Sequence, residues 1–318
     1  MKTAVIAALL PALGCAGHGA SVAETPPASA GPAVVASEPT IEAAQPVAAQ
    51  AVDLQPSATV RLTGSMTQGG VLFGEAEPGA KVRLDGARVM VGADGRFVIG
   101  FGRDSAPGAT LDVTLPDGRQ EKIALAIADR EFPTQRIDGL DPSKVDTFTE
   151  EQLKKIAADN EKKKAARATT DQTAFWAAGF DWPLKGRISG VFGSQRILNG
   201  EPKNPHSGLD VAAPEGTPIK APADGIIRLA DSDMYFEGGL ILLDHGHWLE
   251  SAFLHLSRLD VAPGQAVKKG DVIGAVGMTG RATGPHLHWS LKWTGRLVDP
   301  QLLLDPAANP QAPETVAN

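Results

Sequence analysis

Alternating apolar and polar positions predict two regions of short strands along this chain. In residues 58–130, runs such as 60–63 and 81–84 alternate with a period of two, as a half-buried strand requires. Asp-Gly pairs, which are typical of tight hairpin turns, separate such runs at 85–86, 94–95 and 117–118. We therefore expect a small immunoglobulin-like β-sandwich with no catalytic constellation, acting as a spacer or docking domain.

A second strand-rich region covers residues 181–304. Its apolar runs are bounded by Gly and Pro and lie at 224–229, 239–243, 271–276 and 287–291. The chain as a whole is therefore expected to be mainly β, with two β domains.

Residues 131–180 are expected to form a helical connector between these domains. Thr149 and Gln152 have the spacing of a capping box, which predicts a helix from about 149 to 168. Two Glu–Lys pairs with the favourable i,i+4 order follow, Glu150 with Lys154 and Glu151 with Lys155. The apolar stripe is thin, so we expect a largely solvated helix with the lysine run 162–164 on its solvated face. Contact of that run with an anionic polymer is the alternative.

The N-terminus has the pattern of an export signal. Residues 1–23 combine a Lys2 start, an apolar stretch too short to span a bilayer, and a small-x-small site ending at Ala23. The alternative is a lipoprotein signal ending at Cys15, whose lipid would anchor the chain to a membrane. Residues 24–57 are expected to be a disordered Ala/Pro-rich linker, and residues 305–318 a disordered tail. These patterns indicate a periplasmic protein, held at the outer membrane if Cys15 is lipidated.

Composition excludes some function classes. Hydrophobic residues at 42% and charged residues at 21% are ordinary for a soluble globular protein. The net charge of −7 argues against nucleic acid, because binding to phosphates needs basic patches. The single cysteine, Cys15, lies in the signal region, so neither a disulfide nor a thiolate ligand is expected in the globular part.

Histidine is concentrated in the second β region, where six of the seven fall between positions 206 and 288. On a strand, His286 and His288 project to one face because successive side chains alternate. His206 and Asp210 stand four apart, and His255 lies in an apolar run. A catalytic zinc site takes three protein ligands and leaves one position for water. Each motif alone is weak, but together they predict a zinc hydrolase; residue order does not say which histidine of the pair binds metal.

The segment from 192 to 300 resembles the LytM/lysostaphin-type zinc metalloendopeptidases, which cut peptidoglycan peptides. The matching runs are His206-Ser-Gly-Leu-Asp210, His255-Leu-Ser257, Lys268-Lys-Gly-Asp-Val-Ile-Gly274, Thr279-Gly-Arg-Ala-Thr-Gly-Pro-His-Leu-His288 and Asp299-Pro300. The resemblance implies that residues 181–304 form an antiparallel β-sheet hydrolase domain of the duplicated hybrid motif type.

The resemblance also implies the roles of the site residues. It assigns one Zn²⁺ per chain to His206, Asp210 and His288. It makes His255 and His286 the catalytic histidines, which act near the attacking water and the substrate carbonyl.

Other residues have weaker assignments. Arg196, Asn199 and Tyr235 are candidates for substrate binding, with a surface-loop position as the alternative. His245 and His247 are expected to be structural or to line the groove.

The resemblance implies an endopeptidase that hydrolyses peptide cross-links of peptidoglycan during wall growth or division. The alternative is a non-catalytic LytM-type regulator that binds and activates other wall hydrolases. All three ligand positions and both catalytic positions are filled, which favours the enzyme. Expected partners are peptidoglycan stem peptides, with other wall or division proteins as candidates for the β-sandwich.

Overall fold

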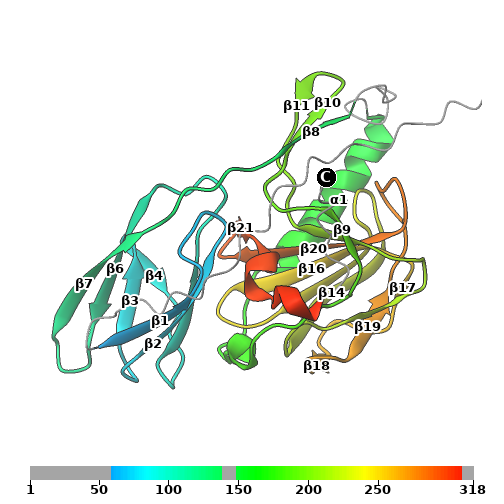
Figure 1. The fold of residues 1–318 in the computed structure, drawn as a ribbon. Coiled ribbons are helices and arrows are strands. Elements are labelled where there is room, and N and C mark those ends of the chain that lie inside the picture. The colour runs from blue at the N-terminus through cyan, green and yellow to red at the C-terminus, as the bar shows by residue number, and fades with distance from the viewer. Residues whose placement is uncertain (1–58, 138–147, 310–318) are drawn as a thin grey trace, which may run out of the picture. The chain divides into compact units, whose positions relative to one another are not determined.

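The computed structural model describes residues 59–137 and 148–309, which belong to one compact unit (Figure 1). The fold is mainly β, as predicted. The export signal, the lipidation site at Cys15 and the linker lie outside the described residues. None of the helices in the described ranges is long and apolar enough to cross a membrane.

The N-terminal module consists of two antiparallel sheets around a shared apolar core. One sheet has the order β1 (Val60–Gly64), β2 (Val71–Ala76), β5 (Arg96–Gly100), and the other β4 (Ala87–Val89), β3 (Lys81–Leu84), β6 (Gly108–Thr114), β7 (Gln120–Ala126). Asp85 and Gly86 connect β3 to β4 with φ of 49° and 78°. Those left-handed values are what a two-residue hairpin turn requires, so the Asp-Gly signal was informative here.

The C-terminal module is built on an eight-stranded antiparallel sheet. Its order is β18 (Ala266–Val267), β14 (Gly225–Met234), β15 (Gly238–Asp244), β16 (Leu249–Leu256), β20 (His286–Trp293), β12 (Leu209–Ala212), β9 (Arg187–Gly190), and β21 (Arg296–Val298) pairs with β20. A smaller sheet has the order β13 (Pro218–Lys220), β19 (Val272–Ala275), β17 (Arg258–Leu259). Leu287, Trp289 and Leu291 are buried on one face of β20, so the residues between them line the opposite face.

Helix α1 (Glu150–Ala166) begins as predicted, with Thr149 as N-cap and both bonds of the capping box present. The helix is largely solvated, as predicted, and Asp159 is its one buried residue, but ion pairs dock one side of it on the sheet. Asp159 is buried and accepts from Lys155, so Lys155 is not paired with Glu151 as expected. The apolar pattern of the helix could not predict its contact with the sheet, because ion pairs rather than an apolar stripe make that contact.

The lysine run of this helix takes part in that docking. Lys162 lies 2.7 Å from Asp231, and Lys163 pairs with Glu237 while keeping a mostly buried side chain. Only Lys164 is largely exposed, at 79% of its side chain. Two of the three lysines therefore bind the β14–β15 hairpin region, and the Lys162 side chain stays about half exposed to solvent.

The connector also contributes more than a helix. Strand β8 (Thr134–Ile137) pairs in parallel with β10 (Gln195–Leu198), which continues to β11 (Glu201–Pro202). The described part also holds the 3-10 turns η2 (Phe175–Ala178), η3 (Pro300–Leu303) and η4 (Pro306–Ala308).

The predicted tail begins too early at residue 305. The Asn309 side chain is buried and bonds both backbone groups of Gly186, while Trp182 donates to the Asp305 carbonyl. These polar contacts hold residues 305–309 against the sheet.

Contacts near residue 130 join the two modules. Arg130 lies 2.9 Å from the buried Asp299 carboxylate, and the Asp299 amide donates to the Gly69 carbonyl. On the N-terminal side, Phe73 stacks on Trp176 at 4.9 Å between ring centroids. The N-terminal module is therefore packed against the sheet that carries the site.

Candidate metal centre

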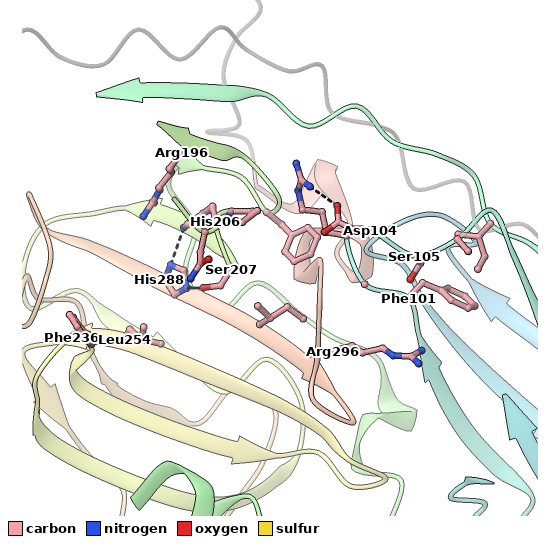
Figure 2. Close-up of a pocket in the computed structure, with 18 of the residues that line it drawn as sticks. Phe101, Asp104, Ser105, Arg196, His206, Ser207, Phe236, Leu254, His288 and Arg296 are labelled. Atoms are coloured by element: carbon pink, nitrogen blue, oxygen red, sulfur yellow. Dashed lines mark hydrogen bonds and ion pairs between the residues drawn. The ribbon is translucent and has the colours of Figure 1, made fainter. Parts of the chain in front are cut away.

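Three side chains from two neighbouring strands and a loop converge on one point. Asp210 on β12 stands directly opposite His288 on β20, and His206 lies in the loop before β12. His288 Nδ1 lies 2.7 Å from Asp210 Oδ1 and 3.1 Å from His206 Nε2, which lies 3.1 Å from Asp210 Oδ2. Figure 2 shows His206 and His288 facing each other across this point. All three residues are buried, and together they form a group able to hold a metal ion.

The outer nitrogen of each histidine has a partner that fixes the ring. His206 Nδ1 lies 2.9 Å from the Val191 carbonyl, and His288 Nε2 lies 3.2 Å from Ser207 Oγ. A carbonyl only accepts, so His206 Nδ1 carries the proton and Nε2 keeps its lone pair. Outer partners of this kind orient metal-binding imidazoles. The inner atoms available to a metal are therefore His206 Nε2 and His288 Nδ1, together with the carboxylate.

The protonation states suit a metal site. Burial alone raises the pKa of Asp210, but the imidazoles of His206 and His288 outweigh it and hold that pKa well below its usual range. Burial lowers the pKa of His288, although the Asp210 carboxylate opposes this shift. A carboxylate and neutral imidazoles are the forms that bind metal.

The donor set fits zinc. Tetrahedral ligands with metal–nitrogen bonds of about 2.0–2.1 Å stand roughly 3.3 Å apart. The two inner imidazole nitrogens here lie 3.1 Å apart, and each lies 2.7 to 3.1 Å from one oxygen of the Asp210 carboxylate. Gly190 on β9 lies so close that a Cβ there would stand 2.4 Å from Asp210 Oδ2. Only a residue without a side chain leaves room for the carboxylate.

The two predicted catalytic histidines lie beside this group. The rings of His255 and His286 are 4.9 Å apart, and His286 Nε2 lies 3.9 Å from Asp210 Oδ1. His286 Nδ1 contacts the Gly284 carbonyl at 2.8 Å, and His255 Nδ1 contacts the Thr279 carbonyl at 2.9 Å. Each ring therefore keeps Nε2 as the acceptor, and the structure brings all five residues together.

His255 reaches the site through an unusual backbone conformation. Phe253 pairs with Trp289 on the core face and Leu254 with His288 on the site face, so regular alternation would turn His255 towards the core. Instead its φ is 66°, a left-handed value for which His is enriched among non-glycine residues. Burial first, and then the nearby imidazoles of His286 and His288, lower the pKa of His255 to about 4, so this ring is neutral near pH 7.

The three weaker candidates occupy different places. Arg196 on β10 lies beside the group, with its guanidinium 3.7 Å from Asp210 Oδ2 (Figure 2). Asn199 lies in the turn between β10 and β11, and Tyr235 packs edge-on against Phe148 and Phe236. Of the three, only Arg196 lines the cleft that contains the metal ligands. A substrate contact for Asn199 or Tyr235 remains a prediction.

This cleft has a volume of about 940 Å³ and draws residues from both modules. The loop containing Phe101, Asp104 and Ser105 forms part of its lining, as do Phe236 and Arg296 (Figure 2). Arg281 lines it as well. Strand periodicity gave no signal for the loop from the N-terminal module. Arg281 lay within the 279–288 motif but was not singled out. Its guanidinium lies 4.5 Å from the Phe236 ring centroid.

His245 and His247 are structural, one of the two roles expected. His245 Nδ1 contacts the Asp224 carbonyl at 2.8 Å, and Nε2 contacts Ser251 Oγ at 2.8 Å. His247 Nε2 contacts the Gln172 carbonyl at 2.8 Å. Both rings are almost wholly buried.

Comparisons with known proteins centre on the same segment. Residues 204–300 match the model of peptidase family M23. The chain is 43% identical over 95 residues to the DD-carboxypeptidase/endopeptidase Mpg of Neisseria meningitidis, which is 30% of this chain and 22% of that protein. It is 40% identical over 116 residues to the peptidoglycan DD-endopeptidase ShyA of Vibrio cholerae, which is 36% of this chain and 27% of ShyA. The chain thus spans about a quarter of the length of these relatives.

A solved structure matches a larger part of the chain. The crystal structure assigned to a peptidase M23 from Pseudomonas aeruginosa is 31% identical, with a TM-score of 0.58. The match covers 75% of this chain and 95% of that one, so it extends beyond the segment with the metal-binding group. On this evidence, the chain belongs to peptidase family M23.

Proposed function

We propose that this protein is a zinc-dependent endopeptidase that hydrolyses peptide cross-links of peptidoglycan, with one zinc per chain. The observation that carries the proposal is the buried His206–Asp210–His288 group with two further imidazoles beside it. The names of the relatives, DD-endopeptidase among them, support the substrate class.

Each part of the site has a role in this chemistry. A zinc ion held by His206, Asp210 and His288 would lower the pKa of a bound water towards about 7 and polarise a carbonyl. His255 and His286 each present Nε2 to the site, because Nδ1–H of each ring donates to a backbone carbonyl. One ring accepts the proton of the attacking water at Nε2 and passes it to the leaving amine. The other ring donates from Nε2 to the developing oxyanion, which requires its imidazolium form, because Nδ1–H is already bonded to a backbone carbonyl.

The low pKa of His255, about 4, favours the role of proton acceptor over that of a standing imidazolium. The geometry leaves the division of roles between the two histidines open, since His286 lies beside Asp210 and His255 beside His288 within one cluster.

Arg196 and Arg281 suit a substrate that carries free carboxylates. Both line the cleft. Burial lowers the pKa of Arg281, and repulsion by the positive charge of Arg196 lowers it as well. Among the described residues, Arg281 forms no ion pair, and the ion pair of Arg196 is with Asp210 at 3.7 Å. A stem-peptide carboxylate would neutralise the pair, since guanidinium groups bind carboxylates in a bidentate manner. The D-alanyl to diaminopimelate cross-link is the bond we propose.

The place of action follows from the sequence rather than from the fold. We propose export to the periplasm through the signal in residues 1–23, with attachment at Cys15 as the lipoprotein variant. Other wall or division proteins are proposed as partners of the N-terminal module.

The test uses two histidines two residues apart on β20. Purified wild-type protein is expected to bind one zinc and to release cross-linked muropeptide products, detected by mass spectrometry, and a chelator should stop the release. His288→Ala should abolish zinc binding and cleavage, whereas His286→Ala should abolish cleavage with zinc still bound. A wild-type protein that binds zinc but releases nothing from wall material would replace the enzyme by a regulator that acts through binding.

A further inference from the structure

A second cavity, of about 790 Å³, lies at the other end of the strands that carry the site. Strand β16 passes from Glu250, which lines this cavity, to His255 near its end, and β20 passes from His288 to Trp293, which also lines the cavity. The cavity is also lined by Arg88, Met90 and Val91 of the N-terminal module. The chemistry proposed for the metal cleft leaves this cavity without a role.

The cavity and the metal centre lie on the same face of the sheet. Leu254 pairs with His288 and Glu250 with Lys292, so these side chains project to one side while Trp289 and Leu291 are buried on the other. Lys292 stands four residues from His288, which is about 13 Å along a strand. An extended polymer lying along β20 could therefore contact both places.

Trp248 is held at this cavity in a strained conformation. It is 38% exposed, the φ values of His247 and Trp248 are 52° and 64°, and left-handed backbone is unfavourable for a bulky side chain. Its amide donates to Thr170 Oγ1, and its carbonyl accepts from the Thr294 amide, so the turn is fixed on both sides. Because the indole is partly exposed, its packing contributes little to offset this backbone strain. Strain of this kind clusters at ligand-binding and active sites.

The charges around the indole favour an anion. Lys292 is half-buried and forms no ion pair among residues 59–137 and 148–309, because its neighbour Glu250 is bonded by Arg167 at 2.7 Å. Arg88 is exposed and likewise has no ion pair with any described residue. Burial first, and then Arg167, lower the pKa of Lys292, which marks an ammonium group in need of a counter-ion. The other two charged residues that line the cavity, Arg228 and Asp244, form an ion pair at 2.6 Å and so neutralise each other.

We propose that this cavity is a second substrate site, which binds an uncut disaccharide-peptide unit of the peptidoglycan strand. The indole face of Trp248 would pack on the apolar face of a sugar ring, and Lys292 with Arg88 would bind a carboxylate of the attached stem peptide. This inference rests on the proposed function, because it assigns the ligand to the same polymer. Binding energy from such a remote unit positions the cross-link at the reacting centre.

The test measures binding of a soluble, uncross-linked disaccharide-peptide by calorimetry to the full chain. Trp248→Asn removes the indole with a residue that tolerates a left-handed backbone, and Lys292→Gln removes the charge with little change in size. Each should weaken binding about 10-fold, the loss expected for one aromatic or charged contact in a partly desolvated site. The matched controls are Val272→Asn, an exposed apolar residue on β19, and Lys122→Gln on β7, and both should bind as the wild type does.

A second comparison separates this site from the metal cleft. Cleavage of a cross-linked peptide dimer without sugars should be unchanged in Trp248→Asn and Lys292→Gln. Cleavage, at low concentration, of a sugar-bearing dimer whose glycan strand also carries an uncut disaccharide-peptide unit should fall about 10-fold. Wild-type affinity in both variants, or equal losses on both dimers, would overturn the proposal. The binding assay needs no turnover, so a wild type that cuts neither dimer would count against the proposed function alone.

Discussion

Replacing Gly190 by alanine tests how closely the backbone of β9 approaches the metal ligands. The new Cβ would stand 2.4 Å from Asp210 Oδ2, 3.0 Å from its Cγ and 3.1 Å from His206 Cε1, where ordinary contacts begin at 3.4 Å. The carboxylate must therefore move by about 1 Å, since the strand backbone cannot. A displacement of that size at a catalytic group costs on the order of 100-fold in rate, and disturbed ligand support costs about 10- to 100-fold in metal affinity.

Zinc affinity is measured by competition with a chromophoric chelator, and activity by the release of muropeptide products. We expect Gly190→Ala to bind zinc about 10- to 100-fold more weakly, which is about 1.4–2.7 kcal/mol, and to lose activity at low zinc. Gly108→Ala is the matched control, because its Cβ meets nothing closer than 3.8 Å in another strand. Wild-type zinc affinity in Gly190→Ala, with the control also unchanged, would refute the geometry of the site.

Three further predictions concern stability. The unfolded chain takes up a proton at His245 as the pH falls through 6.5, whereas the folded protein does so only near its pKa of about 4. Stability should therefore be full above pH 6.5 and fall by roughly 3 kcal/mol between pH 6.5 and 4, and urea unfolding should show a smaller fall in His245→Gln. Arg130→Met leaves the Asp299 carboxylate buried without its partner and should cost about 3–5 kcal/mol in urea unfolding, with part recovered by adding Asp299→Asn. Lys163→Met should destabilise the docked helix by about 1 kcal/mol or more while Lys164→Met has little effect, because only the first side chain is mostly buried in an ion pair; equal effects would contradict the docking described.

Local rules predicted the parts of the fold that depend on neighbouring residues. The capping box at Thr149 and the turn at Asp85 and Gly86 follow from side-chain bonds and φ preferences within a few residues. Alternation placed His286 and His288 on one face of β20, with Leu287 in the core. Alternation could not tell which of these two histidines binds the metal, because that depends on which of them stands opposite Asp210 of β12.

Long-range contacts explain what sequence analysis missed. The docking of α1 depends on Asp231 and Glu237, about seventy residues away, and no helical period reports such partners. His255 reaches the site only through its left-handed φ, so alternation alone would have put it in the core. The loop of the N-terminal module enters the cleft through packing between modules. The resemblance to the LytM/lysostaphin-type peptidases pointed to the five clustered residues without these contacts.

The central claim is that three side chains bind one zinc and leave it open to water, with two further histidines free to act. Anomalous diffraction from zinc-loaded crystals tests this most directly. We predict one zinc peak about 2.0–2.2 Å from His206 Nε2, an Asp210 oxygen and His288 Nδ1, with His255 and His286 not bound to it. A peak bonded to His286 in place of His288, or to a fourth protein side chain, would contradict the account.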